Sequence, residues 1–426
     1  MKITTFQIVV LAIFGVSIIG GVIIFATQKS GGKGTGVPVV IWGTMPQANF
    51  TAATSEITKG SGGMKVTYVE KRADTFDHNL IEALASGTGP DVILLPQDLI
   101  MRLRGKILPM PYSVLPLRTY KDTFIQESSL YLDANGVLAV PFTIDPLVMY
   151  WNRDMLINAN LALPPKTWDE FITLVPKLTV KDKNLNILKS AVALGEFRNI
   201  TNAKDIISAL LLQTGNSITA LTDNGLVSTM SPPTLSSIGA INFYTDFANP
   251  VKPDYSWNRS LSSSLDMFVA GDLAFYFGYA SEIGKIRDKN PNLNFDVTYF
   301  PQPKGAPVPV TFGRIQGFAV LRSSANSNDA FNDIITLTSP SVLSPLGGVT
   351  GLPSVRLDMQ TSSAADPYQT VFYNSAIRSR GWLDPNPVSS GPIFQTMIES
   401  ITSGELEAGD AIGATSDNLK RLIREQ

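Results

Sequence analysis

The stretch DANGVLAVPFTIDPLVMYWNRD, residues 133–154, decides the fold. Leu138 to Pro141 is predicted to be extended, and Leu147 to Trp151 is an apolar run of the length of a buried strand. Two extended segments so close together indicate a sheet at the centre of the chain. The flanking sequence shows which kind of sheet it is.

Upstream, strands are predicted at 37–42, 64–70 and 91–95. Asp74 is expected to cap a helix that places Phe76, Leu80 and Leu84 on one face. A strand, a helix and another strand in this order predict a parallel sheet with right-handed crossovers. Because open parallel sheets bind ligands beyond the carboxyl ends of their strands, the residues that follow 42 and 95 are candidate site positions.

Downstream, Thr167 is expected to cap a helix in which Trp168 anchors the core. Further strands are predicted at 273–277, 295–300 and 317–321, and helices at 206–212 and 235–247. The last 80 or so residues read as helical with proline-rich interruptions. This alternation again indicates an α/β protein.

Composition narrows the function classes. A chain of 426 residues exceeds what one hydrophobic core usually supports, so two lobes are expected. Charged residues make up 16% and the net charge is −2, which does not predict binding to nucleic acid or to an anionic membrane surface. Cysteine is absent and His78 is the one histidine, so no cofactor, metal site or thiol nucleophile is expected.

The N-terminus predicts a membrane anchor. Residues 6–26 carry no charge and are long enough to span a bilayer. A cleaved signal peptide is the alternative, but bulky residues stand where its small-residue cleavage site would be. Residues 28–37 are rich in glycine and predict a flexible tether. The globular part is therefore expected outside the cytoplasm, held by a single-pass helix.

Five segments carry a resemblance to a known family. They are GTGPDV at 87–92, residues 133–154, PPKTWDEF at 164–171, FDVT at 295–298 leading to PQPKG at 301–305, and GFAV at 317–320 with GLP at 351–353. Their order and spacing over roughly 38–426 resemble the extracellular solute-binding proteins of bacterial sugar uptake, the family of maltose-binding protein. The departure is the N-terminus, where the family usually has a lipidated cysteine or a cleaved signal.

The resemblance implies a two-lobed periplasmic-binding-protein fold of type II with hinge strands. Its lobes would be 38–141 plus 315–350 and 142–314 plus 351–426, with crossings near 140–143, 309–314 and 348–353. It also implies a monomer without enzymatic activity. The protein would capture a carbohydrate between its lobes and deliver it to the permease of an ABC transporter.

Sugar recognition needs charged or amide groups for hydroxyls and aromatic faces for C–H surfaces. Trp42 and Gln97 end predicted strands, and Thr143, Asp145 and Arg314 fall at predicted crossings. The resemblance adds two aromatic residues that would border the ligand, Tyr279 and Trp382. Each has a plainer interpretation as a core, capping or surface-paired residue. Together they form the candidate ligand site.

Other functions stay open at this point. A membrane-anchored glycan hydrolase would need a carboxylate pair, and among 36 acidic residues some pair is inevitable. The sequence contains no Gly-x-Ser-x-Gly elbow or phosphate loop. A binding protein for a polyamine, peptide or metal complex is the nearer alternative. A sensor ectodomain is a third, although only five residues precede the predicted span.

Overall fold

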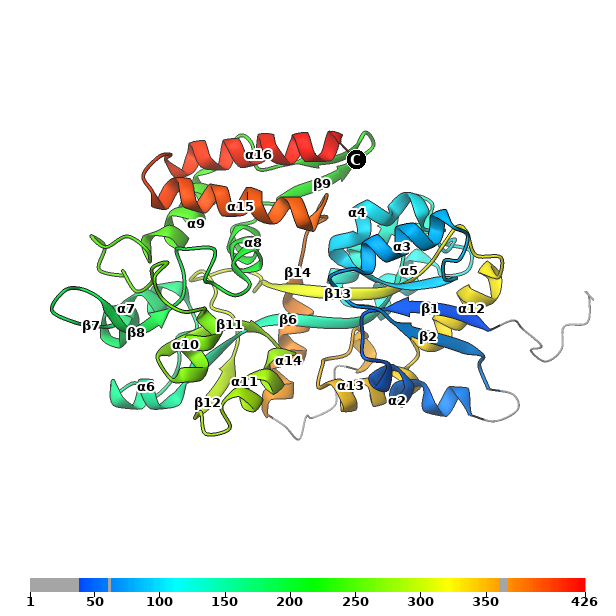
Figure 1. The fold of residues 1–426 in the computed structure, drawn as a ribbon, viewed down its shortest axis with the longest axis horizontal. Coiled ribbons are helices and arrows are strands. Elements are labelled where there is room, and N and C mark those ends of the chain that lie inside the picture. The colour runs from blue at the N-terminus through cyan, green and yellow to red at the C-terminus, as the bar shows by residue number, and fades with distance from the viewer. Residues whose placement is uncertain (1–37, 60–62, 360–366, 426) are drawn as a thin grey trace, which may run out of the picture.

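The computed structural model describes residues 38–59, 63–359 and 367–425, which form two lobes side by side (Figure 1). In the first lobe, helices pack around β1 (Val39–Gly43), β2 (Val66–Glu70) and β3 (Val92–Pro96). Two long strands, β6 (Val140–Asn152) and β13 (Thr311–Val320), run from this lobe into the second. The predicted anchor at 6–26 and tether at 28–37 lie outside the described residues.

One sheet of ten strands links the two lobes, in the order β2-β1-β3-β13-β6-β11-β8-β7, with β12 on β6 and β14 on β13. The strands of the second lobe are β7 (Val180–Lys181), β8 (Ile187–Val192), β11 (Leu273–Tyr279), β12 (Phe295–Thr298) and β14 (Ser379–Arg380). Two small hairpins pair β4 (Leu132–Asp133) with β5 (Gly136–Val137) and β9 (Thr219–Thr222) with β10 (Gly225–Ser228). As predicted, β1 pairs in parallel with both β2 and β3.

Helices cover both faces of the sheet. The α-helices are α2 (Gln47–Thr58), α3 (Phe76–Ala85), α4 (Ile100–Leu103), α5 (Leu117–Thr123), α6 (Arg153–Asn158), α7 (Trp168–Leu178), α8 (Ala203–Gln213), α9 (Leu235–Asp246), α10 (Ser264–Ala270), α11 (Glu282–Lys289), α12 (Ser327–Leu337), α13 (Pro340–Thr350), α14 (Pro367–Arg378), α15 (Pro387–Thr402) and α16 (Ala408–Arg424). Short 3-10 turns are η1 (Gln97–Leu99), η2 (Arg104–Lys106), η3 (Gln126–Tyr131) and η4 (Leu357–Met359). None of the helices within 38–59, 63–359 or 367–425 is long and apolar enough to cross a membrane.

Two hydrophobic cores meet at the long strands. On β6 the first core ends at Ile144 and the second begins at Leu147. On β13 the second core ends at Phe312 and the first begins at Ile315. Two residue pairs lie between the cores, Asp145 opposite Arg314 and Pro146 opposite Gly313. The change of core therefore falls at one level on both strands, which is where a hinge between rigid bodies would lie. The lobe boundaries expected from the sequence stay a prediction.

The sequence predicts β6 as two separate extended segments, whereas it is one strand of 13 residues. Every position along it is buried except Asp145, which is half-buried. A strand covered on both faces reads as a nearly continuous apolar run, and the proline at 146 hides that continuity.

Of the two helix caps predicted from the sequence, the one at α7 is confirmed and the one at α3 is wrong. At α7 the Thr167 hydroxyl accepts from the Glu170 amide at 3.3 Å, and Trp168 is buried, as predicted. The predicted cap at Asp74 was wrong. The α3 helix is preceded by Thr75 without a side-chain cap, because Asp74 is drawn to Arg72, with an Oδ2–Nη2 distance of 2.6 Å.

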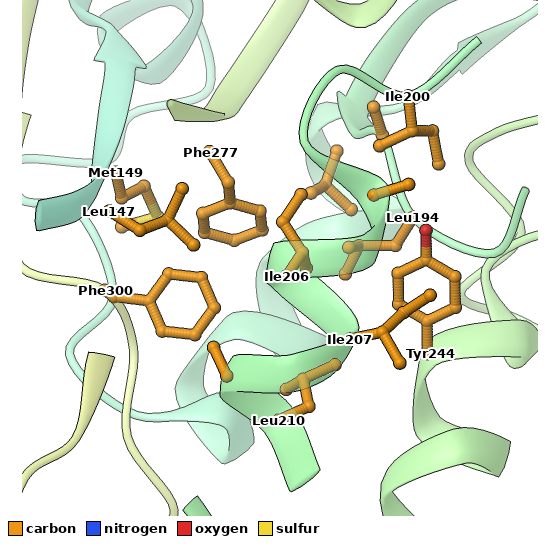
Figure 2. Packing of buried hydrophobic residues seen from close by; sticks show 14 of the residues in the cluster. Leu147, Met149, Leu194, Ile200, Ile206, Ile207, Leu210, Tyr244, Phe277 and Phe300 are labelled. Carbon is orange, nitrogen blue, oxygen red and sulfur yellow. The ribbon is translucent and has the colours of Figure 1, made fainter. Parts of the chain in front are cut away.

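Helix α8 is fixed firmly in the core of the second lobe. Figure 2 shows Ile206 and Ile207 between Tyr244 on one side and Phe277 and Phe300 on the other. Its middle positions are at most 3% exposed, and burial of each large aliphatic side chain contributes about 1.5–3 kcal/mol. The N-terminal turn of α8 is thereby held in place, and it faces the gap between the lobes.

Candidate functional site

A cavity of about 1040 Å³ opens between the lobes. Thr44 and Gln97, which follow the carboxyl ends of β1 and β3, line it from the first lobe. Arg314 and Gln316 on β13 form its floor at the hinge. The second lobe contributes the first turn of α8 and residues before and within the first turns of α15. The cavity therefore lies at the sheet edge where open parallel sheets bind ligands.

Gln97 and Asp98 form the wall of the first lobe. The Gln97 side chain is 5% exposed, and its Oε1 accepts from the Ile315 amide at 3.0 Å, which ties the end of β3 to β13. The Asp98 carboxylate opens into the cleft and makes no hydrogen bond or ion pair with any other described residue. Desolvation by the surrounding protein, followed by the charge of Asp384, raises the pKa of Asp98, against the lowering effect of Lys204 and Arg314.

An ion pair forms the wall of the second lobe. Lys204, in the first turn of α8, pairs with Asp384 and donates to the Ser390 hydroxyl at 2.7 Å. Asp384 also accepts from the Asn386 amide at 3.0 Å, next to the start of α15. Trp382 lines the cavity beside this pair, and its indole Nε1 donates to the Ser208 hydroxyl at 3.1 Å. These bonds fix both the charges and the aromatic ring in place.

A second ion pair crosses the hinge. Arg314 on β13 contacts Asp205 on α8, with Nη2 and Oδ2 2.5 Å apart. The Tyr279 hydroxyl donates to the same carboxylate oxygen at 2.7 Å. The Arg314 guanidinium carbon lies 4.0 Å from the centre of the Tyr279 ring, within cation–π range. Burial raises the pKa of the Tyr279 phenol, so Tyr279 acts as a neutral donor.

Three of the seven residues predicted from the sequence line the cavity, namely Gln97, Arg314 and Trp382. The other four lie beside or behind it. The Lys71 ammonium lies over the Trp42 ring, 3.7 Å from its centre. Thr143 is buried and lies opposite Gln316 in the strand register. Tyr279 lies beneath Arg314. Contact of any of the seven with a ligand stays a prediction.

Asp145 lies at the hinge, opposite Arg314 in the strand register. Its Oδ1 accepts from the Ser281 amide at 3.0 Å. Burial raises the pKa of this carboxyl to about 6, against the lowering effect of the Ser281 bonds and of Arg314. At neutral pH Asp145 is therefore mostly ionised, and it faces the guanidinium across the strand pair.

Sequence reasoning missed the residues that carry most of the charge, namely Asp98, Lys204, Asp205 and Asp384. Asp98 could have been found, because it follows Gln97 directly at the end of a predicted strand. Lys204 and Asp384 are 180 positions apart, and no local pattern connects them.

The helix N-termini around the cavity already have carboxylates. Asp77 lies in the first turn of α3, and Asp205 in that of α8. Asp384 accepts a backbone amide at the start of α15. Because helix N-termini attract anions, the negative charge of these side chains offsets the attraction that an anionic ligand would otherwise meet there. Among residues 38–59, 63–359 and 367–425, no group of three or more His, Cys, Asp or Glu side chains is placed to hold a metal ion.

A family model described as bacterial extracellular solute-binding protein matches residues 31–341. The chain belongs to this family. It is thus a solute-binding protein, not an enzyme, and an extracytoplasmic one. A curated relative, the uncharacterized lipoprotein in the oleD 5' region of Streptomyces antibioticus, is 29% identical over 142 residues. That match covers 31% of this chain and only about a third, 32%, of the relative.

Solved structures share the fold over almost the whole length. A cyclo/maltodextrin-binding protein complexed with maltotetraose gives a TM-score of 0.74 at 17% identity, covering 92% of this chain and 99% of that one. The cyclic α-maltosyl-1,6-maltose binding protein from Arthrobacter globiformis gives 0.73 at 17%, covering 92% and 100%. An ABC transporter solute-binding protein from Thermotoga lettingae, bound with α-D-tagatose, gives 0.67 at 20%, covering 91% and 100%. At such identities the likeness establishes the two-lobed fold and not the ligand.

Proposed function

We propose that this solute-binding protein captures a carbohydrate in the cleft between its lobes and delivers it to the permease of an ABC transporter. The observation that carries the proposal is the cavity itself. One wall comes from the first lobe, one from the second, and the floor from a hinge strand. Proteins that share its fold carry maltotetraose or tagatose in their structures, which supports the same class of ligand here.

The chemistry of the walls suits a polyol. Ionised side chains form hydrogen bonds that are about twice as strong as neutral ones, and the fixed pairs Lys204–Asp384 and Arg314–Asp205 present both donors and acceptors. Trp382 adds an aromatic edge to the same wall. A free phosphate or carboxylate is a poorer guest, since the neighbouring helix N-termini already hold carboxylates.

Capture would proceed by rotation at the level of Asp145 and Arg314, where both long strands change core. Residues from the two walls then reach the solute together, and the cleft loses water. A ligand shifts such an equilibrium only by the difference in its affinity for the two states. The contacts made only after closure supply that difference.

The location of the protein completes the proposal. An uncleaved helix at 6–26, outside the described residues, would hold a monomer close to its permease, with the cleft on the extracytoplasmic side. Membrane fractionation of cells that express the full chain tests this directly. The protein should stay with the membrane at high salt and at pH 11, and should become soluble once residues 1–28 are deleted. Release of the full chain would contradict the anchor.

A thermal-shift screen tests the ligand class. The full chain, in mild detergent, is heated with neutral mono- and oligosaccharides, amino sugars, spermidine and short peptides. A ligand that binds the native state at 100 times its Kd stabilises it by about 2.7 kcal/mol, so a hit raises the melting temperature. A shift with sugars supports the proposal. A shift with spermidine or peptides and with none of the sugars would overturn it.

A further inference from the structure

The cleft is not electrically balanced. Among the charged side chains that line it, most pair with an oppositely charged neighbour: Asp74 with Arg72, Asp77 with Arg102, His78 with Glu82 when protonated, Arg198 with Glu399, Lys204 with Asp384, and Arg314 with Asp205. Asp98 differs from these, because it has no partner among the described residues. One carboxylate is therefore left over.

The two cations that face Asp98 across the cleft are not free to balance it. Lys204 is held by Asp384 and by the Ser390 hydroxyl at 2.7 Å. Arg314 is held by Asp205 at 2.5 Å and lies over the Tyr279 ring. Turning either cation toward Asp98 would leave a second carboxylate without its partner. Both cations favour the charged form of Asp98, but neither is free to pair with it, so a cationic ligand group would supply the partner that Asp98 lacks.

Closure of the lobes would raise the energetic cost of leaving the Asp98 charge unpaired. In the structure Asp98 is exposed to water in the cleft, although the surrounding protein already desolvates its carboxyl group in part. When the lobes close, that water is removed, and an isolated carboxylate is costly to bury unless it is paired. A neutral guest can offer only hydroxyl donors, whereas an ammonium group forms a charge-assisted bond and cancels the charge. An anionic guest adds repulsion.

We infer that the cleft selects its solute by charge, and that the preferred guest is a glycan with a protonated amine placed against Asp98. This inference rests on the proposed carbohydrate-binding function and specifies it. Asp98 is then the specificity-determining residue. Anionic glycans such as uronates and sugar phosphates are excluded.

The experiment compares probes that share one β-1,4-linked backbone. The full chain is titrated by calorimetry at pH 6 with cellotriose, with the glucosamine trimer, with the N-acetylglucosamine trimer and with cellotriose oxidised to its uronates. The glucosamine trimer should bind about tenfold or more tightly than either neutral trimer. This advantage should shrink when salt is raised from 20 to 200 mM, because charge pairing is screened.

Two variants show whether Asp98 is responsible. Asp98→Asn removes the charge and keeps the shape, and should abolish the advantage of the glucosamine trimer over the two neutral trimers. Asp223→Asn makes the same change of net charge at an exposed turn between β9 and β10, and should leave the preference intact.

The outcomes separate the two claims. Equal affinity for amino and neutral trimers, or an amine preference that survives in Asp98→Asn, overturns the charge selection and leaves the carbohydrate function standing. Tightest binding of the uronate overturns it as well. If no glycan binds in this titration or in the thermal-shift screen, the proposed function itself fails, and this inference fails with it.

Discussion

Glu127 is a buried acid that should make the protein more stable at low pH than at high pH. It lies in η3, is 2% exposed, and neither carboxyl oxygen has a hydrogen-bond partner among the described residues. It packs against Gly381, where a Cβ atom would collide with the Glu127 carboxyl and lie 2.9 Å from the Gln97 amide nitrogen. Burial raises the pKa of Glu127 to about 8, although the charge of Arg380 and the nearby Gly381 backbone partly oppose the shift.

The sign of the effect follows from proton binding. Between its ordinary pKa of 4.5 and its folded pKa of about 8, Glu127 keeps its proton in the folded chain and loses it in the unfolded chain. The stability that it contributes is therefore complete below pH 4.5, falls as pH rises, and is gone above about pH 8. Three and a half pH units at about 1.36 kcal/mol each give a loss of about 5 kcal/mol, of which about 3 occur by pH 7.

Glu127→Gln removes this dependence, because the amide has nearly the same shape and does not titrate. Urea unfolding followed by circular dichroism at pH 5, 6, 7 and 8 gives the free energy of unfolding of both proteins. The two should differ by about 1 kcal/mol or less at pH 5, and the variant should be more stable by about 3 kcal/mol or more at pH 8. Glu405→Gln, at an exposed position, is the control and should follow the wild type.

Other acids also titrate in this range, so the comparison with the variant isolates Glu127. Burial raises the pKa of Asp333 to about 6, as it does that of Asp145. Both groups are present in both proteins. Stability curves for wild type and Glu127→Gln that run parallel from pH 5 to 8 would refute the account of Glu127 as a neutral buried acid.

Three further predictions concern packing and the site. Gly381→Ala should lower the free energy of unfolding by about 1–3 kcal/mol, because the added methyl meets Glu127; an unchanged urea midpoint would contradict this. Leu210→Ala should cost about 2–5 kcal/mol by leaving a cavity beneath α8, whereas Val388→Ala at an exposed position should cost little. Asp205→Asn should weaken sugar binding about tenfold or more by releasing Arg314 and Tyr279, and wild-type affinity by calorimetry would show that the pair does not order the site.

Hydrophobic periodicity and strand-forming residues were sufficient to predict most of the secondary structure and the parallel pairing of the first lobe. The strand–helix–strand order predicted the parallel pairing of β1 with β2 and β3. The predicted strand at 273–277 lies within β11, and the one at 317–321 overlaps the last four residues of β13. These signals are local, because each depends on neighbours a few positions apart. The continuity of β6 was missed, since Asp145 and Pro146 separate its two apolar segments.

The site was harder to predict, because it is assembled from distant segments. Gln97 and Arg314 were found by their places at a strand end and a crossing, and both line the cavity. Lys204 and Asp384 had no such signal, because only the packing of α8 against the start of α15 brings them together. Tyr279 was predicted as a stacking residue, but whether a ring beneath Arg314 also meets the ligand depends on contacts that no local sequence pattern encodes.

The central claim is that the two lobes close on a solute, and a distance across the cleft measures it. The chain has no cysteine, so spin labels at Glu82→Cys on α3 and Thr396→Cys on α15 report one distance without background. Both positions are exposed and lie in different lobes (Figure 1). Addition of a sugar that binds should shift the distribution measured by double electron–electron resonance to shorter distances. Saturation with that sugar and no change in the distribution would contradict closure.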